Sequence, residues 1–361
     1  MSTPCSTNWN PASTRDCWIA ASSRFSEGSK GISMQPRIVF HGENATCFSD
    51  GFAGLIREGV SISVLPDVLA SDEQIETYAS ADVIVGVKFD DSLPRPRNLS
   101  LFHVPGAGYD AVRLDLVPPG AVVCNCFGHD PAIAEYVFAA ILAQHVPLAD
   151  ADRRLRQGDW AYWSGAPERL HDEMSGKTIG LLGFGHIGQA IARRAKAFGM
   201  QVSVANRSPV AVSDLVDRSF TLEALDGFWS SAEFIVVSVP LTESTRGIVG
   251  SDAFAVMKPD TIVFNVGRGP TIDEAALYQA LRDRRIGGAV IDTWYAYPGP
   301  VSANPMPSAL PFQELDNVVM TPHMSGWTRG TVRRRQQTIA ENVNRRLRGE
   351  ACVNLVRGET D

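Results

Sequence analysis

The sequence of 361 residues lacks several features that mark particular classes of protein. Its six cysteines form neither a C-x-x-C pair nor a cluster with histidine at zinc spacing, so we expect no disulfide framework and no metal site. No apolar run approaches the roughly 18 residues that a membrane span needs. Residues 1–34 lack the basic start and apolar core of a secretory signal, and we expect them to be a disordered tail of a cytoplasmic protein.

The chain also has no excess of positive charge. It carries 33 Lys and Arg against 40 Asp and Glu, a formal net charge of −7, and no stretch is basic enough to follow a phosphate backbone. We therefore expect no nucleic-acid partner and no membrane partner. The content of 44% hydrophobic and 20% charged residues is typical of a globular protein, and the length favours two domains of about 150 residues each.

What the sequence does contain is a regular alternation of short β-branched runs and helical stretches, which is typical of parallel α/β sheets. The first series of predicted strands is RIVFHG, VSISVL, ADVIVGVK, LSLFHV and AVVCN. The second series is KTIGLLG, MQVSVAN, EFIVVSVP, DTIVFNVG, GGAVIDTW and NVVMTPH. These two series predict an α/β fold with two doubly wound parallel-sheet domains.

Two helical stretches connect or follow these series. Residues 131–158 are mostly apolar and could run from one domain to the other. Residues 331–349 place one stripe of side chains on a helix, formed by Val332, Gln336, Ile339, Ala340, Val343 and Leu347. We expect the arginines of this last helix to face solvent or a groove between domains, rather than to form an anion-binding surface.

The most specific local motif is GFGHIG, because it follows a predicted strand directly and opens a predicted helix. Gly183 permits a tight turn, Gly185 lets backbone amides approach a pyrophosphate, and Gly188 allows close helix packing. The alternative is a glycine-rich turn needed only for packing. The residues predicted to bind the dinucleotide here are Gly183, Gly185, His186, Ile187 and Gly188.

The acidic residue expected at the end of the next strand is missing, since SVANRSP places Asn206, Arg207 and Ser208 there. A carboxylate would accept hydrogen bonds from the ribose hydroxyls and repel a 2′-phosphate, whereas these side chains offer neutral and cationic donors. The sequence therefore favours NADP as the cofactor, with NAD possible. In the alternative, Arg207 stacks on the adenine or points into water.

Five motifs in order, GKTIGLLGFGHIGQAIARRAKAFGM, VSVPLTESTRGIV, FNVGRGPTIDEAALYQAL, GGAVIDTW and NVVMTPHMSG, make the chain resemble the D-isomer-specific 2-hydroxyacid dehydrogenases, which include phosphoglycerate and formate dehydrogenases. The resemblance implies a flavodoxin-like substrate domain (35–147 plus 326–361), a Rossmann cofactor domain (148–325) and catalysis between them. It also implies a homodimer formed through an arm at 142–167. Further cofactor-binding residues that it implies are Val239, Pro240, Val266, Asp292 and Ser325, with Asp292 receiving the nicotinamide carboxamide.

The same resemblance implies roles for a few residues in the reaction. Arg268 matches the substrate-binding arginine and His323 matches the general acid/base, while the peptides of Gly106, Ala107 and Gly108 match the carboxylate-binding loop. A guanidinium can hold a carboxylate and polarise a keto oxygen, and an imidazole can donate the proton that completes the reduction. The implied function is an NAD(P)-dependent oxidoreductase that transfers hydride between nicotinamide and a small 2-hydroxy or 2-keto acid.

The chain departs from the family pattern at two positions. Tyr297, directly before Pro298, stands where the family carries a Glu that raises the pKa of the histidine, so we expect His323 to be a weaker base and Tyr297 to replace the Glu. His129 stands where formate dehydrogenases carry a substrate-contacting Asn, and it either faces the substrate or caps the helix near Pro131. The alternatives are a dinucleotide-sensing protein with weak turnover and, less favoured, formate oxidation without proton transfer.

Overall fold

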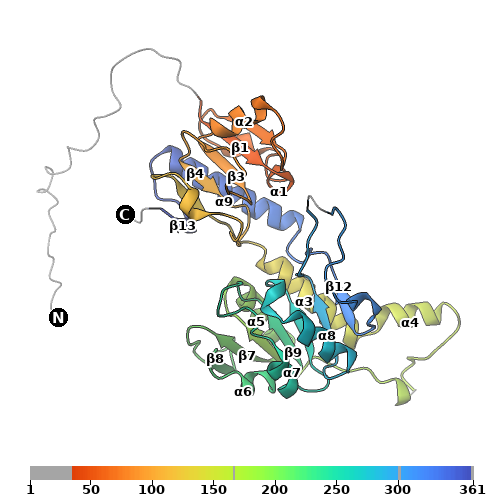
Figure 1. The fold of residues 1–361 in the computed structure, drawn as a ribbon. Coiled ribbons are helices and arrows are strands. Elements are labelled where there is room, and N and C mark those ends of the chain that lie inside the picture. Colours follow the sequence, from red (N-terminus) through yellow and green to blue (C-terminus); the bar gives the residue numbers. More distant parts are fainter. Residues whose placement is uncertain (1–34, 166, 300–301, 359–361) are drawn as a thin grey trace, which may run out of the picture. The chain divides into compact units, whose positions relative to one another are not determined.

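The computed structural model describes residues 35–165, 167–299 and 302–358, so the predicted tail over 1–34 lies outside the described residues. Two sheets organise the rest of the chain (Figure 1). The first sheet has the order β13-β5-β4-β3-β1-β2. Its strands are β1 (Arg37–His41), β2 (Ser61–Leu65), β3 (Val83–Gly86), β4 (Leu101–His103), β5 (Val122–Cys124) and β13 (Leu355–Arg357).

All five strands predicted for this first sheet are present and parallel, in the 2-1-3-4-5 order of flavodoxin-like sheets. Strand β13 was not predicted and pairs antiparallel with β5 at the edge of the sheet. Both faces of the sheet are covered, because Phe40 packs in a cluster with Ile339 while its neighbour Val39 packs in another cluster with Tyr78. Strands buried on both faces read as continuous apolar runs, which is why the sequence revealed them.

The second sheet has the order β12-β11-β10-β9-β6-β7-β8, and all its pairings are parallel. Its strands are β6 (Thr178–Leu182), β7 (Gln201–Asn206), β8 (Arg218–Thr221), β9 (Phe234–Val237), β10 (Ile262–Asn265), β11 (Gly288–Ile291) and β12 (Val318–Met320). Counted from β6, this is the 3-2-1-4-5-6 Rossmann order with one strand added. The predicted strands are confirmed, and β8 is an additional, partly exposed edge strand.

Helices of very different length join these strands. The α-helices are α1 (Glu43–Thr46), α2 (Asp72–Ala79), α3 (Asp130–His145), α4 (Leu148–Leu155), α5 (His186–Ala197), α6 (Asp226–Trp229), α7 (Ser251–Val256), α8 (Glu274–Arg282) and α9 (Arg329–Leu347). Short 3-10 turns occur at Phe52–Leu55, Leu114–Leu116, Pro167–Arg169, Gly269–Thr271 and Phe312–Glu314.

The predicted apolar stretch 131–158 is not one helix. It divides at Val146 and Pro147 into α3 and α4, because proline lacks the N–H that would continue the first helix. Helix α3 buries Val137 and Ile141 in a cluster with β6 and α5 of the second sheet. Within the described part of the chain no single helix is both long and apolar enough to cross a bilayer, and α3 and α4 pass such a test only together across a bend of 46°.

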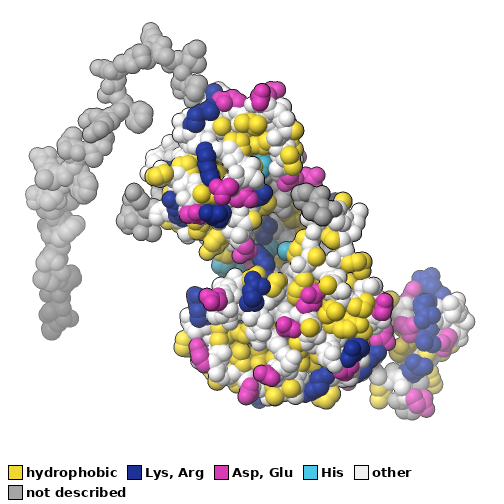
Figure 2. Space-filling model, viewed as in Figure 1, with side chains coloured by type: hydrophobic (Ala, Val, Ile, Leu, Met, Phe, Trp, Pro, Cys, Tyr) yellow, Lys and Arg dark blue, Asp and Glu magenta, His cyan; other side chains and the backbone are white. Residues whose placement is uncertain are grey.

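Helix α4 is strongly charged, and Figure 2 shows basic and acidic side chains together over it. Arg153 and Arg154 both form ion pairs with Asp150, and Arg156 forms one with Asp152. Pairs three and four residues apart lie on the same face of a helix, so these arginines are neutralised locally.

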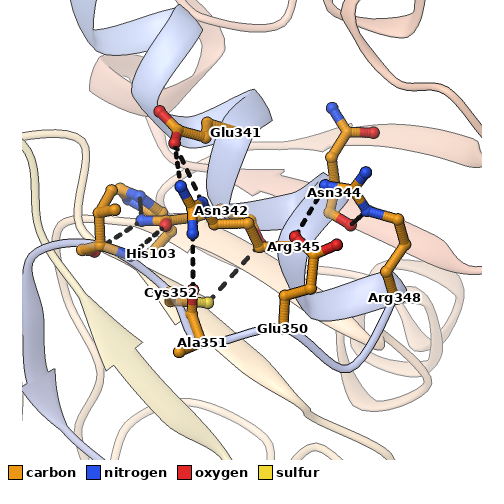
Figure 3. A network of polar contacts seen from close by, with 10 residues as sticks. His103, Glu341, Asn342, Asn344, Arg345, Arg348, Glu350, Ala351 and Cys352 are labelled. Carbon is orange, nitrogen blue, oxygen red and sulfur yellow. Dashed lines mark hydrogen bonds and ion pairs between the residues drawn. The ribbon is translucent and has the colours of Figure 1, made fainter. Parts of the chain in front are cut away.

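Helix α9 is fixed to the first sheet by a buried asparagine (Figure 3). Asn342 Nδ2 lies 3.0 Å from His103 Nε2 on β4 and donates to Val353 O at 3.0 Å, while Asn342 Oδ1 accepts from Val353 N at 2.8 Å. Since the amide donates to Nε2, the proton of the neutral His103 ring is on Nδ1, which lies 3.1 Å from Val104 O. Burial lowers the pKa of His103 to about 4, which agrees with a neutral ring.

Candidate active site

The residues predicted to bind the cofactor all lie at or beyond the carboxyl ends of strands in the second sheet. This edge is where doubly wound sheets bind ligands. The glycine-rich turn follows β6, Asn206 ends β7, and Val239 and Pro240 follow β9. Val266 follows β10, Asp292 follows β11, and Ser325 lies beyond β12.

The glycine-rich turn has the geometry of an anion cradle. Gly183 has φ +98°, a conformation that L side chains rarely adopt. A Cβ on Gly188 would lie 2.4 Å from Gly183 O, so the first turn of α5 can approach β6 only without a side chain there. A Cβ on Gly185 would meet no atom within 4 Å, which leaves open space beside the start of the 12-residue helix α5. These features fit a bound pyrophosphate.

Asn206 braces this turn. Its Oδ1 accepts from Phe184 N at 3.3 Å, and its Nδ2 donates to Ser208 O at 3.0 Å. The side chain thus links the glycine-rich turn to the loop after β7. Arg207 is exposed beside it, which leaves its guanidinium accessible to a ligand at this edge.

Asp292 is fully buried and organises the turn that carries His323. Its Oδ1 accepts from Thr321 Oγ1 at 2.6 Å and from Met324 N at 2.8 Å, and its Oδ2 accepts from Ser325 N at 3.0 Å. His323 has φ +58°, which is rare for a residue other than glycine. The carboxylate therefore holds a strained turn in place, in addition to the role that the resemblance implies for it.

Tyr297 reaches His323. Its hydroxyl lies 3.1 Å from His323 Nδ1 and also accepts from Trp294 N at 3.0 Å. With one lone pair of its oxygen used by Trp294 N–H, the hydroxyl keeps one lone pair and one proton for Nδ1, so it accepts from Nδ1–H in one tautomer of the ring and donates to Nδ1 in the other. Burial lowers the pKa of the His323 ring below its ordinary value; Asp292 opposes this effect, and Arg268 and Arg335 add to it.

Arg268 lies against the loop that follows β4. A Cβ on Gly108 would come within 1.8 Å of Arg268 Nη2, so a glycine there is necessary for the observed approach. Arg268 Nε forms an ion pair with Asp110 at 3.2 Å, and Nη1 donates to Gly267 O at 2.9 Å. The structure thus brings Arg268 to the loop Gly106–Gly108.

Comparison with known proteins decides the family. Residues 138–325 match the NAD-binding domain of the D-isomer-specific 2-hydroxyacid dehydrogenases. A glyoxylate reductase of Thermococcus onnurineus is 34% identical, over 84% of this chain and 92% of that protein. The chain belongs to this family. It is therefore a nicotinamide-dependent oxidoreductase of the 2-hydroxyacid class.

Other relatives agree with this assignment. A D-3-phosphoglycerate dehydrogenase of Methanocaldococcus jannaschii is 32% identical over 80% of this chain, which spans only 54% of that longer protein. A solved structure of a family member from Aeromonas salmonicida has a TM-score of 0.73 and 25% identity, and it covers 90% of this chain and 99% of its own. The resemblance inferred from the motifs is confirmed.

His129 of this dehydrogenase occupies the N-cap position of α3, but its side chain makes no capping hydrogen bond. Its Nδ1 is buried without a hydrogen-bond partner among the described residues. Burial lowers the pKa of His129 to about 4, and the charges of Arg335 and Arg268 contribute. The neighbouring Phe127 ring lies 4.5 Å from the His186 ring of the glycine-rich turn. The imidazole is thus neutral and lies near both arginines.

The motifs did not identify Arg335, which the structure places near the same loop. A Cβ on Gly106 would lie 3.9 Å from Arg335 Nη1. Arg335 is partly exposed, and the expectation that the α9 arginines face solvent or a groove stays a prediction for this residue. The signal was present, because position 335 is three residues after Val332 and four before Ile339 on the inner stripe. Among the described residues, no group of three or more His, Cys, Asp or Glu could hold a metal ion.

Proposed function

We propose that this dehydrogenase interconverts a small 2-oxo acid and the corresponding 2-hydroxy acid, with NADPH preferred and NADH possible. The observation that carries the proposal is the approach of Arg268 to the loop Gly106–Gly108, in the same site as the Tyr297–His323 pair. Cation, backbone amides and a proton donor are the groups that such a reduction requires. We also propose that residues 35–147 and 326–361 form the substrate domain and that residues 148–325 form the cofactor domain.

Arg268 and the loop amides orient the acid. A guanidinium can hold the carboxylate and the keto oxygen together, and the peptide N–H groups of residues 106–108 supply further donors. The charge that develops on the carbonyl oxygen during reduction lies next to the cation, which stabilises the transition state more than the ground state.

His323 donates the proton during reduction and accepts it during oxidation. With the dinucleotide held through its pyrophosphate at the glycine-rich turn, its nicotinamide would supply or accept the hydride. During reduction, protonated His323 gives its Nε2 proton to the substrate oxygen, while during oxidation the neutral ring receives it. In the neutral ring that takes part in this transfer, Nε2 carries no proton and Nδ1–H donates to the Tyr297 oxygen, which has no negative charge at neutral pH. Lacking a carboxylate partner, the ring should be a weaker base than in relatives that carry the Glu.

The cofactor preference rests on the loop after β7. Asn206 is occupied in bracing the glycine-rich turn, and exposed Arg207 supplies a cation where a carboxylate would repel a 2′-phosphate. The residues proposed to hold the cofactor are Gly183, Gly185, His186, Ile187, Gly188, Asn206, Arg207, Ser208, Val239, Pro240, Val266, Asp292 and Ser325.

We also propose that the chain forms a homodimer through the arm 142–167. Large apolar side chains are exposed in and just beyond this arm: Leu148 is 74% exposed, Trp160 67% and Leu170 86%. Apolar side chains gathered on one segment are typical of a protein interface. Light scattering of the purified chain would measure the mass, and a monomer at micromolar concentration would contradict this assembly.

A panel of 2-oxo acids assayed with NADPH and NADH in parallel tests the function. Glyoxylate, pyruvate, hydroxypyruvate and larger 2-oxo acids should include at least one that is turned over. The variants Arg268→Ala and His323→Ala should each lose about two to four decades of kcat/KM while still binding NADPH. Binding of NADPH without turnover of any acid would leave a dinucleotide-sensing protein, and turnover of formate alone would exclude the proton step at His323.

A further inference from the structure

We propose that Arg335 is a second anion-binding residue of the active site, and that the preferred substrate is a short 2-oxo acid with an additional anionic group, a carboxylate or a phosphate ester. This inference deepens the proposed function and depends on it. Its basis is a partly buried guanidinium that lies beside the substrate loop and lacks an acidic partner among the described residues.

The surroundings of Arg335 set it apart from its neighbours on α9. Arg345 pairs with Glu341 and Arg348 pairs with Glu350. Arg335 forms no ion pair within the described ranges, and its Nε donates to Phe127 O at the long distance of 3.4 Å. Burial lowers the pKa of Arg335, and the charge of adjacent Arg334 adds to this effect. A partly desolvated cation without a counterion costs free energy, which a bound anion would offset.

Its position relative to the loop makes Arg335 a partner for substrate. A Cβ on Gly106 would lie 3.9 Å from Arg335 Nη1, whereas one on Gly108 would lie 1.8 Å from Arg268 Nη2. These two glycines are two residues apart and thus separated by at most about 7 Å. Two cations are therefore available at the two ends of a short loop, and one small molecule with two anionic groups can reach both. Of the two, only Arg268 has an acidic partner in the described structure, Asp110.

This proximity has an electrostatic consequence for the two histidines of the site. The positive charge of Arg335 depresses the pKa of His323 and of His129, and Arg268 acts on both rings in the same direction. The guanidinium thus acts on the proposed proton donor itself. A second anion bound there would neutralise part of this charge.

A purely structural role for Arg335 is already filled by its neighbour. Arg334 Nε donates to Gly128 O at 2.7 Å and ties α9 to the segment before α3. Arg335 makes only the longer contact to Phe127 in the same segment. An arginine needed for that contact alone would leave most of its five donors unused at a partly buried position.

The test compares substrates with one and two anionic groups. Values of kcat/KM are measured for glyoxylate and pyruvate, for oxaloacetate and 2-oxoglutarate, and for hydroxypyruvate phosphate, with wild type, Arg335→Gln and Arg335→Lys. Arg333→Gln, an exposed position on the same helix, is the matched control. We expect the wild type to favour at least one dianion, and Arg335→Gln to lower the dianion-to-monoanion ratio by about 10- to 100-fold, mainly through KM. Arg335→Lys should retain part of the preference for the dianion.

Comparison of the dicarboxylate substrates with hydroxypyruvate phosphate shows whether the second anionic group is a carboxylate or a phosphate ester. A wild type without preference for any dianion, or an Arg335→Gln variant that slows both classes equally, would overturn the inference while leaving the proposed function intact. If no 2-oxo acid is turned over, the proposed function falls, and thermal unfolding with NADPH then decides on Arg335. Malonate should raise Tm more than acetate does in wild type but not in Arg335→Gln, and equal shifts in wild type would contradict an anion site. If Arg335→Gln fails to fold, the dianion-to-monoanion ratio of kcat/KM in the wild type and in Arg335→Lys tests the inference in its place.

Discussion

Tyr297 is the residue at which the motifs predict a departure from the family pattern, and its hydroxyl lies 3.1 Å from His323 Nδ1. Replacing it by Glu would place a negative charge beside an imidazole whose pKa is lowered by burial and by two arginines. The charge stabilises imidazolium, so the pKa of His323 should rise and reduction should persist to a pH about one unit or more higher. Oxidation, which needs the neutral ring, should begin at a higher pH.

Profiles of kcat/KM against pH in both directions measure this change. Tyr295→Phe is the control, because the Tyr295 hydroxyl donates to Ile272 O at 3.2 Å and not to the histidine. An unchanged profile in Tyr297→Glu, accompanied by a new ranking of substrates, would show that the 46% exposed phenol selects substrate rather than tuning the imidazole.

Arg207 should determine the preference between NADPH and NADH. Its side chain is exposed beside Asn206, at the position where a carboxylate would favour NADH. We therefore expect a higher kcat/KM with NADPH than with NADH, and a smaller difference between the two cofactors in Arg207→Ala. Hydrogen bonds to a charged phosphate contribute about 1 to 3 kcal/mol, or roughly 5- to 150-fold. Arg193→Ala, a change at an exposed arginine on α5, is a control of equal charge. A tenfold preference of the wild type for NADH would disprove this interpretation.

At the scale of elements, the sequence predicts strands that carry a run of β-branched or apolar residues, including the partly exposed β2 and β12, and misses strands that lack such a run. Strand β6 reads TIGLL and is almost wholly buried, whereas β8 reads RSFT and is exposed at both ends. β13 pairs only at an edge, antiparallel to β5, and no local pattern distinguishes it from a terminal coil. The break between α3 and α4 could have been predicted from Pro147.

Asn342 should contribute to the free energy of unfolding by holding α9 on the first sheet. In Asn342→Leu the volume is kept, but His103 Nε2 and the N–H and C=O of Val353 lose their partner. Each unsatisfied buried group costs about 1 to 3 kcal/mol, so with three such groups the free energy of unfolding should fall by about 3 kcal/mol or more. Urea unfolding measures it. Glu341→Ala, which breaks a half-exposed ion pair on the same helix, should cost less than about 1 kcal/mol. Equal losses in both would contradict this role.

At the scale of the whole molecule, the candidate site draws on segments from both sheets, and this limits what a sequence can predict. Motifs located Arg268 and His323 along the chain, because each lies next to a strand end with a recognisable pattern. The contact of Arg335 with the loop of Gly106 depends on the packing of α9 across the first sheet, which no spacing in the sequence encodes. The hydroxyl of Tyr297 meets His323 only because Asp292 holds a strained turn.

Buried histidines should make the whole fold sensitive to mild acid. Burial lowers the pKa of His103 and of His129 to about 4, from an unfolded value near 6.5. Between these values the unfolded chain binds protons that the folded chain does not, so stability is full above about pH 6.5 and is lost as pH falls toward 4. Each histidine contributes at most about 1.4 kcal/mol for each pH unit in this window. Most carboxylates titrate below it, so urea midpoints at pH 7.5 and 5 isolate the effect. We expect a clearly lower midpoint at pH 5 and a smaller difference in His103→Gln; equal midpoints in the wild type would show that these rings are protonated without cost in the folded protein.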